Sequence, residues 1–347
     1  MQTLSFNKDF GKLISSNLLH NRINIKWKPI ANFTLATELR NRMFWGEEVK
    51  LTPGFASRLR NANDKLDMQK IWIEDSSLVV HTNVERLYAD YGIGKVNIRI
   101  GRQRINWGMT TTWNPNDIFN TYNFLDFDYE ERPGSDAGKI QYRINDMMNI
   151  EAAYAVTGIK NESIAAAKLL LYKWGYDLQL ISGVYKNHIT IGGGWAGNIS
   201  DAGFKGEVQY FMSNQDSSGH LNLTMEGDYV FQHGWYVNAG VLLNSNGLTK
   251  PVTGPEIIDL RISPESLMPT KWNIIVTSSK EITPLFSVTA GILYAPGTNL
   301  LIFLPSLQYS MAENLDINIF WQSFYAEMNN EFKANGHRGF LRIKWSF

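Results

Sequence analysis

The chain has 347 residues, with 33 basic and 33 acidic side chains, and contains no cysteine. The balanced charge argues against a nucleic-acid-binding protein, which would carry an excess of Lys and Arg, and the lack of cysteine excludes disulfide scaffolds and thiolate zinc sites. No apolar stretch approaches the roughly 20 residues that a membrane-spanning helix needs.

Segments in which apolar and polar side chains alternate recur along the whole chain. In 32–45, for example, Leu35, Leu39 and Met43 share one face while Arg40 and Arg42 share the other. Alternation with a period of two predicts β-strands. The predicted strands cover residues 21–28, 32–45, 78–92, 95–106, 138–145, 148–157, 163–173, 176–186, 188–198, 203–212, 219–231, 235–245, 271–279, 285–295, 299–310, 315–326 and 338–347.

Short and long connections alternate between these strands. Short turns include 92–94 and 145–146, whereas long connections fall at 46–77, 107–137, 246–270 and 327–337. Tight turns at one end and long loops at the other are typical of outer-membrane barrels. An even number of strands places both termini at the short-turn end. The 17 predicted strands are an odd number, so the alternation of connections requires one more strand before residue 21, with Met1–Phe6 as its tail.

The sequence therefore predicts an all-β fold in one domain, residues 1–347. The expected architecture is a transmembrane antiparallel up-and-down β-barrel of about 18 strands (range 16–18), with short periplasmic turns and long extracellular loops. A soluble sandwich, barrel or propeller is the alternative. Two features favour the membrane barrel over these soluble folds. The sequence ends in Phe347, and six tryptophans at or near strand ends suit two aromatic girdles. They are Trp45, Trp107, Trp174, Trp235, Trp272 and Trp345.

One stretch resembles a family of porin-like outer-membrane barrels of Gram-negative bacteria. Its strand-end, loop and turn motifs consist of Gly101, Arg102, Gln103, Trp107, Gly108, Asn114, Pro115, Asp117, Arg132, Pro133 and Gly134. The segments 20–22 and 38–42 resemble the variant found in the Bacteroidota. The resemblance implies the outer membrane and passive transport. In that family the barrel-assembly machinery reads a C-terminal Phe, which is Phe347 here.

The connection 107–137 is acidic and also rich in aromatic residues, which favours a loop folded into the lumen. Its acids include Asp126, Asp128, Glu130 and Glu131, against Arg132 as the single base. Basic side chains are expected on the facing inner wall, namely Arg22, Arg40, Arg42, Arg99, Arg143, Arg342 and Lys344. Opposed charges across a narrow gap would sort solutes by charge. The alternative is that the same pairs simply fix the loop to the wall.

Other sites have less support. Asp126, Asp128 and Glu130 alternate, but they lack the glycine and terminal glutamate of a calcium-binding EF-hand loop, so no metal or cofactor is expected. The six histidines lie apart and form no Ser/His/acid set, so no catalytic residues are expected. Arg58 and Arg60 are interpreted as part of a solvated face, with a short helix near Phe55.

The pattern favours a porin-like channel for passive diffusion of small hydrophilic solutes. The alternative is a non-conducting barrel that anchors a multiprotein complex. The expected partners are outer-membrane lipid, the assembly machinery, and either a membrane or lipoprotein partner or further copies of the chain. Nucleic acid is not expected.

Overall fold

The computed structural model describes residues 1–7, 9–60, 65–121, 123–126, 133–159, 162–213, 218–251 and 262–346. Asp128, Glu130, Glu131, Arg132 and Phe347 lie outside the described residues, so their roles stay predictions. Among the described residues, no helix is long and apolar enough to cross a membrane.

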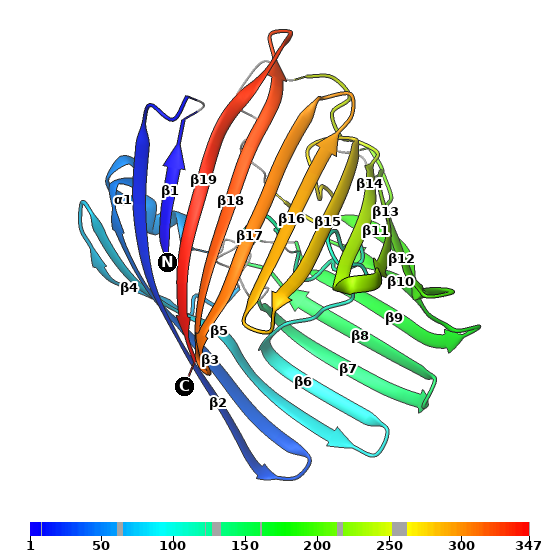
Figure 1. Cartoon of the computed structure of the whole chain (residues 1–347). Coiled ribbons are helices and arrows are strands. Elements are labelled where there is room, and N and C mark those ends of the chain that lie inside the picture. The colour runs from blue at the N-terminus through cyan, green and yellow to red at the C-terminus, as the bar shows by residue number, and fades with distance from the viewer. Residues whose placement is uncertain are drawn as a thin grey trace.

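The strands form one antiparallel sheet (Figure 1). They are β1 (Gln2–Phe6), β2 (Leu13–Ile30), β3 (Phe33–Gly46), β4 (Gln69–Glu74), β5 (Leu78–Ile93), β6 (Val96–Gln103), β7 (Ser135–Asn145), β8 (Met148–Val156), β9 (Ile164–Lys173), β10 (Tyr176–Tyr185), β11 (His188–Ile199), β12 (Ala202–Phe211), β13 (His220–Val230), β14 (Trp235–Asn244), β15 (Trp272–Thr283), β16 (Phe286–Ala295), β17 (Leu300–Ala312), β18 (Leu315–Met328) and β19 (Glu331–Trp345). Short helices are α1 (Glu47–Leu51), α2 (Phe55–Arg58) and the 3₁₀ turn η1 (Gln232–Gly234).

The sheet closes on itself because β1 pairs with both β2 and β19. Gln2 lies opposite Leu341 and Phe6 lies opposite His337. β4 is not part of the ring, since β3 pairs directly with β5 and β4 is added to the far end of β5. Without β4, the ring contains 18 strands among the described residues. The predicted closed antiparallel barrel and its strand number are therefore confirmed.

The two ends of the barrel differ as predicted, with one exception. The tight turns after β2, β5 and β7 lie at the lower end in Figure 1, and the connections carrying α1, α2 and β4 lie at the other end. The predicted long connection 327–337 is wrong. Asn329 and Asn330 turn the chain directly from β18 into β19, with φ values of 54° and 64°. Two successive left-handed residues form a tight hairpin turn, and Asn tolerates that conformation.

The alternation places apolar side chains outside and polar ones inside. Leu307, Ile319 and Leu341 lie side by side on the outer face of β17, β18 and β19, each more than 40% exposed. The inward Asn222 and Glu226 of β13 are almost fully buried, because connections between strands fill part of the lumen. An apolar outer belt around a polar interior is the arrangement that suits lipid.

The tryptophans follow the predicted girdles with one exception. The predicted girdle position of Trp107 is wrong, because its side chain is only 1% exposed and packs inside the barrel. The remaining five are exposed on the outer surface, namely Trp45, Trp174, Trp235, Trp272 and Trp345.

Arginine substitutions should distinguish the two faces of the barrel wall. In lipid vesicles, Ile319→Arg should lower the free energy of unfolding by about 2–4 kcal/mol, the cost of a lipid-facing arginine near the bilayer midplane. Gln308→Arg, which places the charge on the exposed inner face of the neighbouring strand β17, should have little effect. Denaturant titration measures both. Equal losses in the two variants would contradict the assignment of the faces.

Candidate functional site: the lumen

The connection between β6 and β7 folds into the lumen, as predicted. Its described residues 104–121 and 123–126 are called the strap. Trp107, Trp113 and Ile118 in the strap are almost completely buried. Trp107 and Ile118 pack on inward alanines of β7, β8 and β9, including Ala153 and Ala166, whose small side chains leave room for the strap.

Two wall carboxylates hold the middle of the strap. Glu207 on β12 accepts hydrogen bonds from the backbone N–H groups of Met109, Thr110 (2.7 Å) and Asn116 (2.9 Å). Glu226 on β13 accepts from the backbone N–H groups of residues 111 and 112, at 2.6 and 2.8 Å. Both carboxylates are essentially buried. Each side-chain oxygen of a glutamate can accept more than one hydrogen bond, and together these contacts fix the position of the strap.

A glycine-lined niche in β11 receives the side chain of Asn116. Its Nδ2 donates to Gly193 O at 2.8 Å. A Cβ atom at Gly192 would collide with Gln209 Oε1 and would lie 2.9 Å from Asn116 Oδ1. A larger residue at position 192 would therefore displace the side chains of Gln209 and Asn116 from these positions.

The strap crosses the lumen to the opposite wall. Near its end, Gln322 Nε2 on β18 donates to Leu125 O at 2.9 Å. Trp113 and Leu125 pack against wall residues of β14–β18, including Leu242 and Ile302. The strap therefore spans the barrel between β11–β13 and β18 and restricts the passage.

A second connection, between β14 and β15, also enters the lumen and was not predicted. Leu267 and Met268 are buried in the same apolar cluster as Trp113. Asn222 donates to the backbone oxygens of residues 264 and 265, both at 3.0 Å, and Asn244 donates to Met268 O at 2.7 Å. The sequence signal for this packing is the apolar content of the connection, which includes the adjacent pair Leu267 and Met268.

The first part of the motif joins the ends of β6 and β7 to the connection 46–77. Arg102 forms a buried ion pair with Asp136, with N–O distances of 2.9 and 3.0 Å, and also donates to Leu66 O at 2.6 Å. Gln103 Nε2 donates to Ala137 O at 2.9 Å. The contacts of Arg102 and Gln103 therefore hold the chain together where the strap begins.

The rest of the described motif shapes the strap itself. Asn114 Nδ2 donates to Thr110 O at 2.5 Å, and the Cγ of Asn114 lies 2.6 Å from where a Cβ at Gly108 would stand. Asp117 accepts from the Trp107 backbone N–H at 3.3 Å, so this acid contacts the strap itself. Of the remaining motif positions, Pro115 lies within the strap, and Pro133 and Gly134 directly precede β7.

The motif glycine Gly101 should be intolerant of substitution. Its φ is +118°, and a Cβ there would collide with Leu87 O of the neighbouring strand. Gly101→Ala should cost about 1–3 kcal/mol of folding free energy, the usual cost of a non-glycine residue in such a backbone conformation. Gly138→Ala on adjacent β7 is the matched control, because nothing lies within 4 Å of its Cβ position. Denaturation midpoints that fall equally would contradict the expectation.

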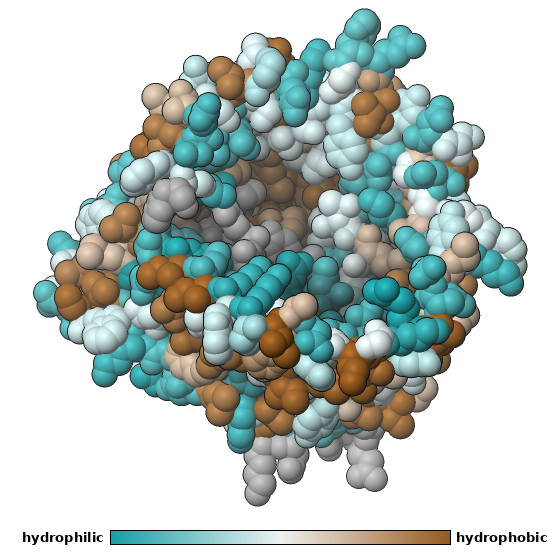
Figure 2. Space-filling model, turned by 90° about the horizontal axis from the view of Figure 1, so that it is seen from below, coloured by the Kyte–Doolittle hydropathy of each residue, from teal (hydrophilic) through white to brown (hydrophobic). Residues whose placement is uncertain are grey.

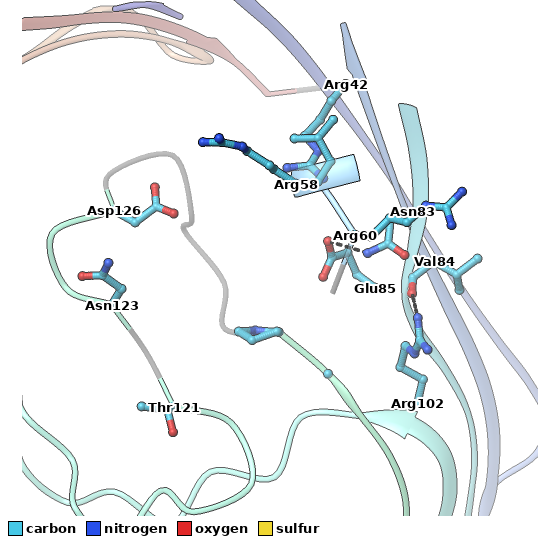
Figure 3. A pocket seen from close by; sticks show the side chains of 13 residues that line it. Arg42, Arg58, Arg60, Asn83, Val84, Glu85, Arg102, Thr121, Asn123 and Asp126 are labelled. Atoms are coloured by element: carbon cyan, nitrogen blue, oxygen red, sulfur yellow. Dashed lines mark hydrogen bonds between the residues drawn. The ribbon is translucent and has the colours of Figure 1, made fainter. Parts of the chain in front are cut away.

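A cavity of about 340 Å³ lies between the strap and the wall formed by β3 and β5 (Figure 3). Asp126 and Asn123 stand on the strap side, and arginines stand on the other side. The charged and polar lining residues are Arg42, Arg58, Arg60, Asn83, Glu85, Arg102, Thr121, Asn123 and Asp126. Seen from the short-turn end, the barrel is hollowed in its middle, with many hydrophilic residues around the opening (Figure 2).

The arginines of this cavity come from two sources. Arg42 on β3 contacts His81 Nδ1 at 3.1 Å and lines the cavity. Arg58 closes α2, and Arg60 follows it in the connection 46–77. Arg58 and Arg60 are exposed, in agreement with their interpretation as part of a solvated face, and they also line the cavity because α2 folds over the mouth of the barrel. Arg40 is buried beside the cavity and pairs with Glu85 at 3.7 Å.

The other predicted basic residues do not line this cavity. Arg22 lies 3.8 Å from Glu38, Arg99 pairs with Asp90 at 2.6 Å, and Arg342 stacks over the ring of Phe320 at 5.3 Å. Arg143 and Lys344 are exposed near the short-turn end. Of the predicted set, the structure therefore brings Arg42 and Asp126 to one cavity. Within the described ranges, no group of three His, Cys, Asp or Glu residues is arranged to hold a metal ion.

The sequence is not matched by any protein-family model. No curated protein matches it either. Similar solved structures exist. The outer membrane protein opdK from Pseudomonas aeruginosa superposes with a TM-score of 0.62 at 8% identity, covering 99% of this chain and 95% of that chain.

Two further structures are similar over almost their whole length. A BenF-like porin from Pseudomonas fluorescens Pf-5 gives a TM-score of 0.61 at 8% identity, covering 99% of this chain and 96% of that chain. OccAB4 from Acinetobacter baumannii gives 0.59 at 8% identity, with coverage of 99% and 96%. The chain therefore has the closed 18-stranded antiparallel fold found in these barrels.

Proposed function

We propose that the chain is a bacterial outer-membrane channel through which small hydrophilic solutes diffuse passively. The apolar outer belt and the exposed tryptophans at strand ends support a position in a membrane. The fold, shared with a protein described as a BenF-like porin, supports a channel in the outer membrane.

The observation that carries the proposal is the charged cavity beside the strap. Arg42, Arg58 and Arg60 stand on one side and Asp126 stands on the other, at the place where the strap narrows the lumen. Glu85 and Arg102 also border the cavity, but Glu85 pairs with Arg40 and Arg102 pairs with Asp136. The described lining is therefore basic in balance. Such a lining raises the local concentration of anions and orients polar solutes in its field.

Planar-bilayer recording tests this function directly. The purified chain should produce discrete conductance steps, and a KCl gradient should give a reversal potential on the anion-selective side. Persistent silence of correctly folded protein would overturn the channel. It would favour the alternative of a non-conducting barrel that anchors a complex, since two connections enter the lumen.

The finer parts of the proposal concern origin and assembly. The segments 20–22 and 38–42 support membership of the Bacteroidota variant of porin-like barrels. The amphipathic strand β19, which closes the barrel, supports recognition by the barrel-assembly machinery during insertion. Deletion of residues 345–347 should then reduce the amount of barrel in the outer membrane.

A further inference from the structure

Four side chains form a hydrogen-bonded row on the outer face of β2, β3, β5 and β4, which is called the polar ladder. The Trp72 indole N–H donates to Thr82 Oγ1 at 2.9 Å, and the Thr82 hydroxyl donates to Asn41 Oδ1 at 2.8 Å. Asn41 Nδ2 then donates to Asn21 Oδ1 at 3.3 Å. In the sheet register, Asn41 lies directly opposite both Asn21 and Thr82.

The polar ladder points away from the lumen. Leu19 and Ile23, which flank Asn21 on the same face of β2, are 60% and 44% exposed on the outer surface. Arg40 and Arg42, the chain neighbours of Asn41, face the opposite way, into the barrel. Successive side chains of a strand point to opposite faces, so the ladder belongs to the outer belt.

The polar ladder lies within the apolar belt and below its rim. Along the outer face of β3, Asn41 is preceded by Leu39 and followed by Met43, and the girdle residue Trp45 comes next. This position is below the level of the headgroups, which tryptophan girdles mark. The corresponding outer positions of the opposite wall are apolar, for example Leu223, Val241, Ile274 and Ile292.

One end of the polar ladder has spare hydrogen-bonding capacity. Asn21 accepts a bond through Oδ1, but its Nδ2 has no acceptor among the described residues. A carboxamide nitrogen carries two donor hydrogens. Acyl chains cannot accept hydrogen bonds, so this amide requires a polar partner within the membrane.

We propose that the polar ladder is the centre of an interface between two copies of this chain. The four ladder side chains are uncharged, and Lys70 lies over the Trp72 ring at the end of the ladder that is far from Asn21. The Asn21–Asn41 end offers both amide donors and amide oxygens, so it is complementary to the same end of a second copy. A two-fold axis along the membrane normal keeps both copies at the same depth and brings the Asn21–Asn41 pair of one against the same pair of the other. Interhelical asparagine pairs stabilise membrane assemblies in the same way.

The cysteine-free sequence allows this interface to be tested by single-cysteine cross-linking in membranes. Ile23→Cys, beside the ladder, should yield a disulfide-linked dimer of twice the chain mass under mild oxidation. Val241→Cys, on the outer face of the opposite wall, should yield little. Adding Asn21→Leu and Asn41→Leu to the Ile23→Cys chain should reduce the dimer yield about tenfold, as expected for the loss of one or two hydrogen bonds in a membrane.

Heat-modifiable migration in gels shows that each variant remains a folded barrel, and Leu19→Cys replaces Ile23→Cys if the latter does not fold. Equal dimer yields from both faces would overturn the proposal. It would also be overturned by a yield unaffected by the leucine substitutions, or by cross-links to a different protein. Each barrel encloses its own lumen, so loss of the dimer would leave the channel function standing.

Discussion

Replacement of both Glu207 and Glu226 by alanine should release the strap and increase the single-channel conductance severalfold. The two carboxylates accept the backbone N–H groups of residues 109–112 and 116. Without them, each buried N–H group that finds no new partner costs about 1–3 kcal/mol. The position of the strap against the wall is then no longer lower in free energy than a position in which the strap is solvated and the lumen is wider.

Two controls isolate the strap in this experiment. Glu207→Gln retains the shape of the side chain and should give an intermediate conductance, because an amide oxygen still accepts but its NH₂ group opposes the surrounding donors. Glu313→Ala removes an exposed acid at the turn between β17 and β18 and should leave conductance unchanged. A folded double variant with wild-type conductance would show that apolar packing alone holds the strap.

Removal of the three cavity arginines should shift ion selectivity toward cations. In the chain carrying Arg42→Ala, Arg58→Ala and Arg60→Ala, Asp126 stays in the cavity lining without the opposing bases. Asp126→Asn should shift the reversal potential in the opposite direction. Both shifts should shrink between 0.1 M and 1 M salt, because the Debye length falls from about 10 Å to about 3 Å.

Lys173→Ala is the matched control for these charges, since Lys173 lies beside the exposed Trp174 at a short turn. Its removal should leave the reversal potential where it was. If the arginine and aspartate variants also left it unchanged, the permeating ions would have to pass elsewhere in the lumen. Arg40 and Arg102 are unsuitable for this test, because breaking their buried pairs would leave Glu85 and Asp136 uncompensated.

The barrel could be predicted because its signal is repeated in every strand. Outer and inner positions alternate, and a membrane barrel requires this in each strand independently. The prediction failed where the signal is local. Residues 13–20 belong to β2, but the polar run Ser15–Asn17 hides the alternation. The turn at Asn329–Asn330 was missed because the outermost part of β19 does not alternate.

The strap could be predicted, but its attachments could not. Its tryptophans and phenylalanines indicate burial, because solvent-exposed loops do not need them. Glu207 and Glu226 occupy inward positions of ordinary amphipathic strands, and nothing in their spacing distinguishes a ligand for backbone N–H groups from a solvated lumen acid. The position of Arg58 and Arg60 at the cavity could not be predicted, because the path of the connection 46–77 depends on tertiary contacts such as Leu66 with Arg102.

The crossing of the lumen by the strap has a consequence for the order of events during biogenesis. Leu125 and Gln322 are hydrogen-bonded although 197 residues separate them in sequence, and Thr111 is 115 residues from Glu226. Contacts between such distant residues form late, because the entropy of closing the intervening chain must be overcome first. The strap can reach its final position only after β18 has joined the sheet. A newly inserted barrel should therefore pass through a short-lived open stage before its lumen narrows.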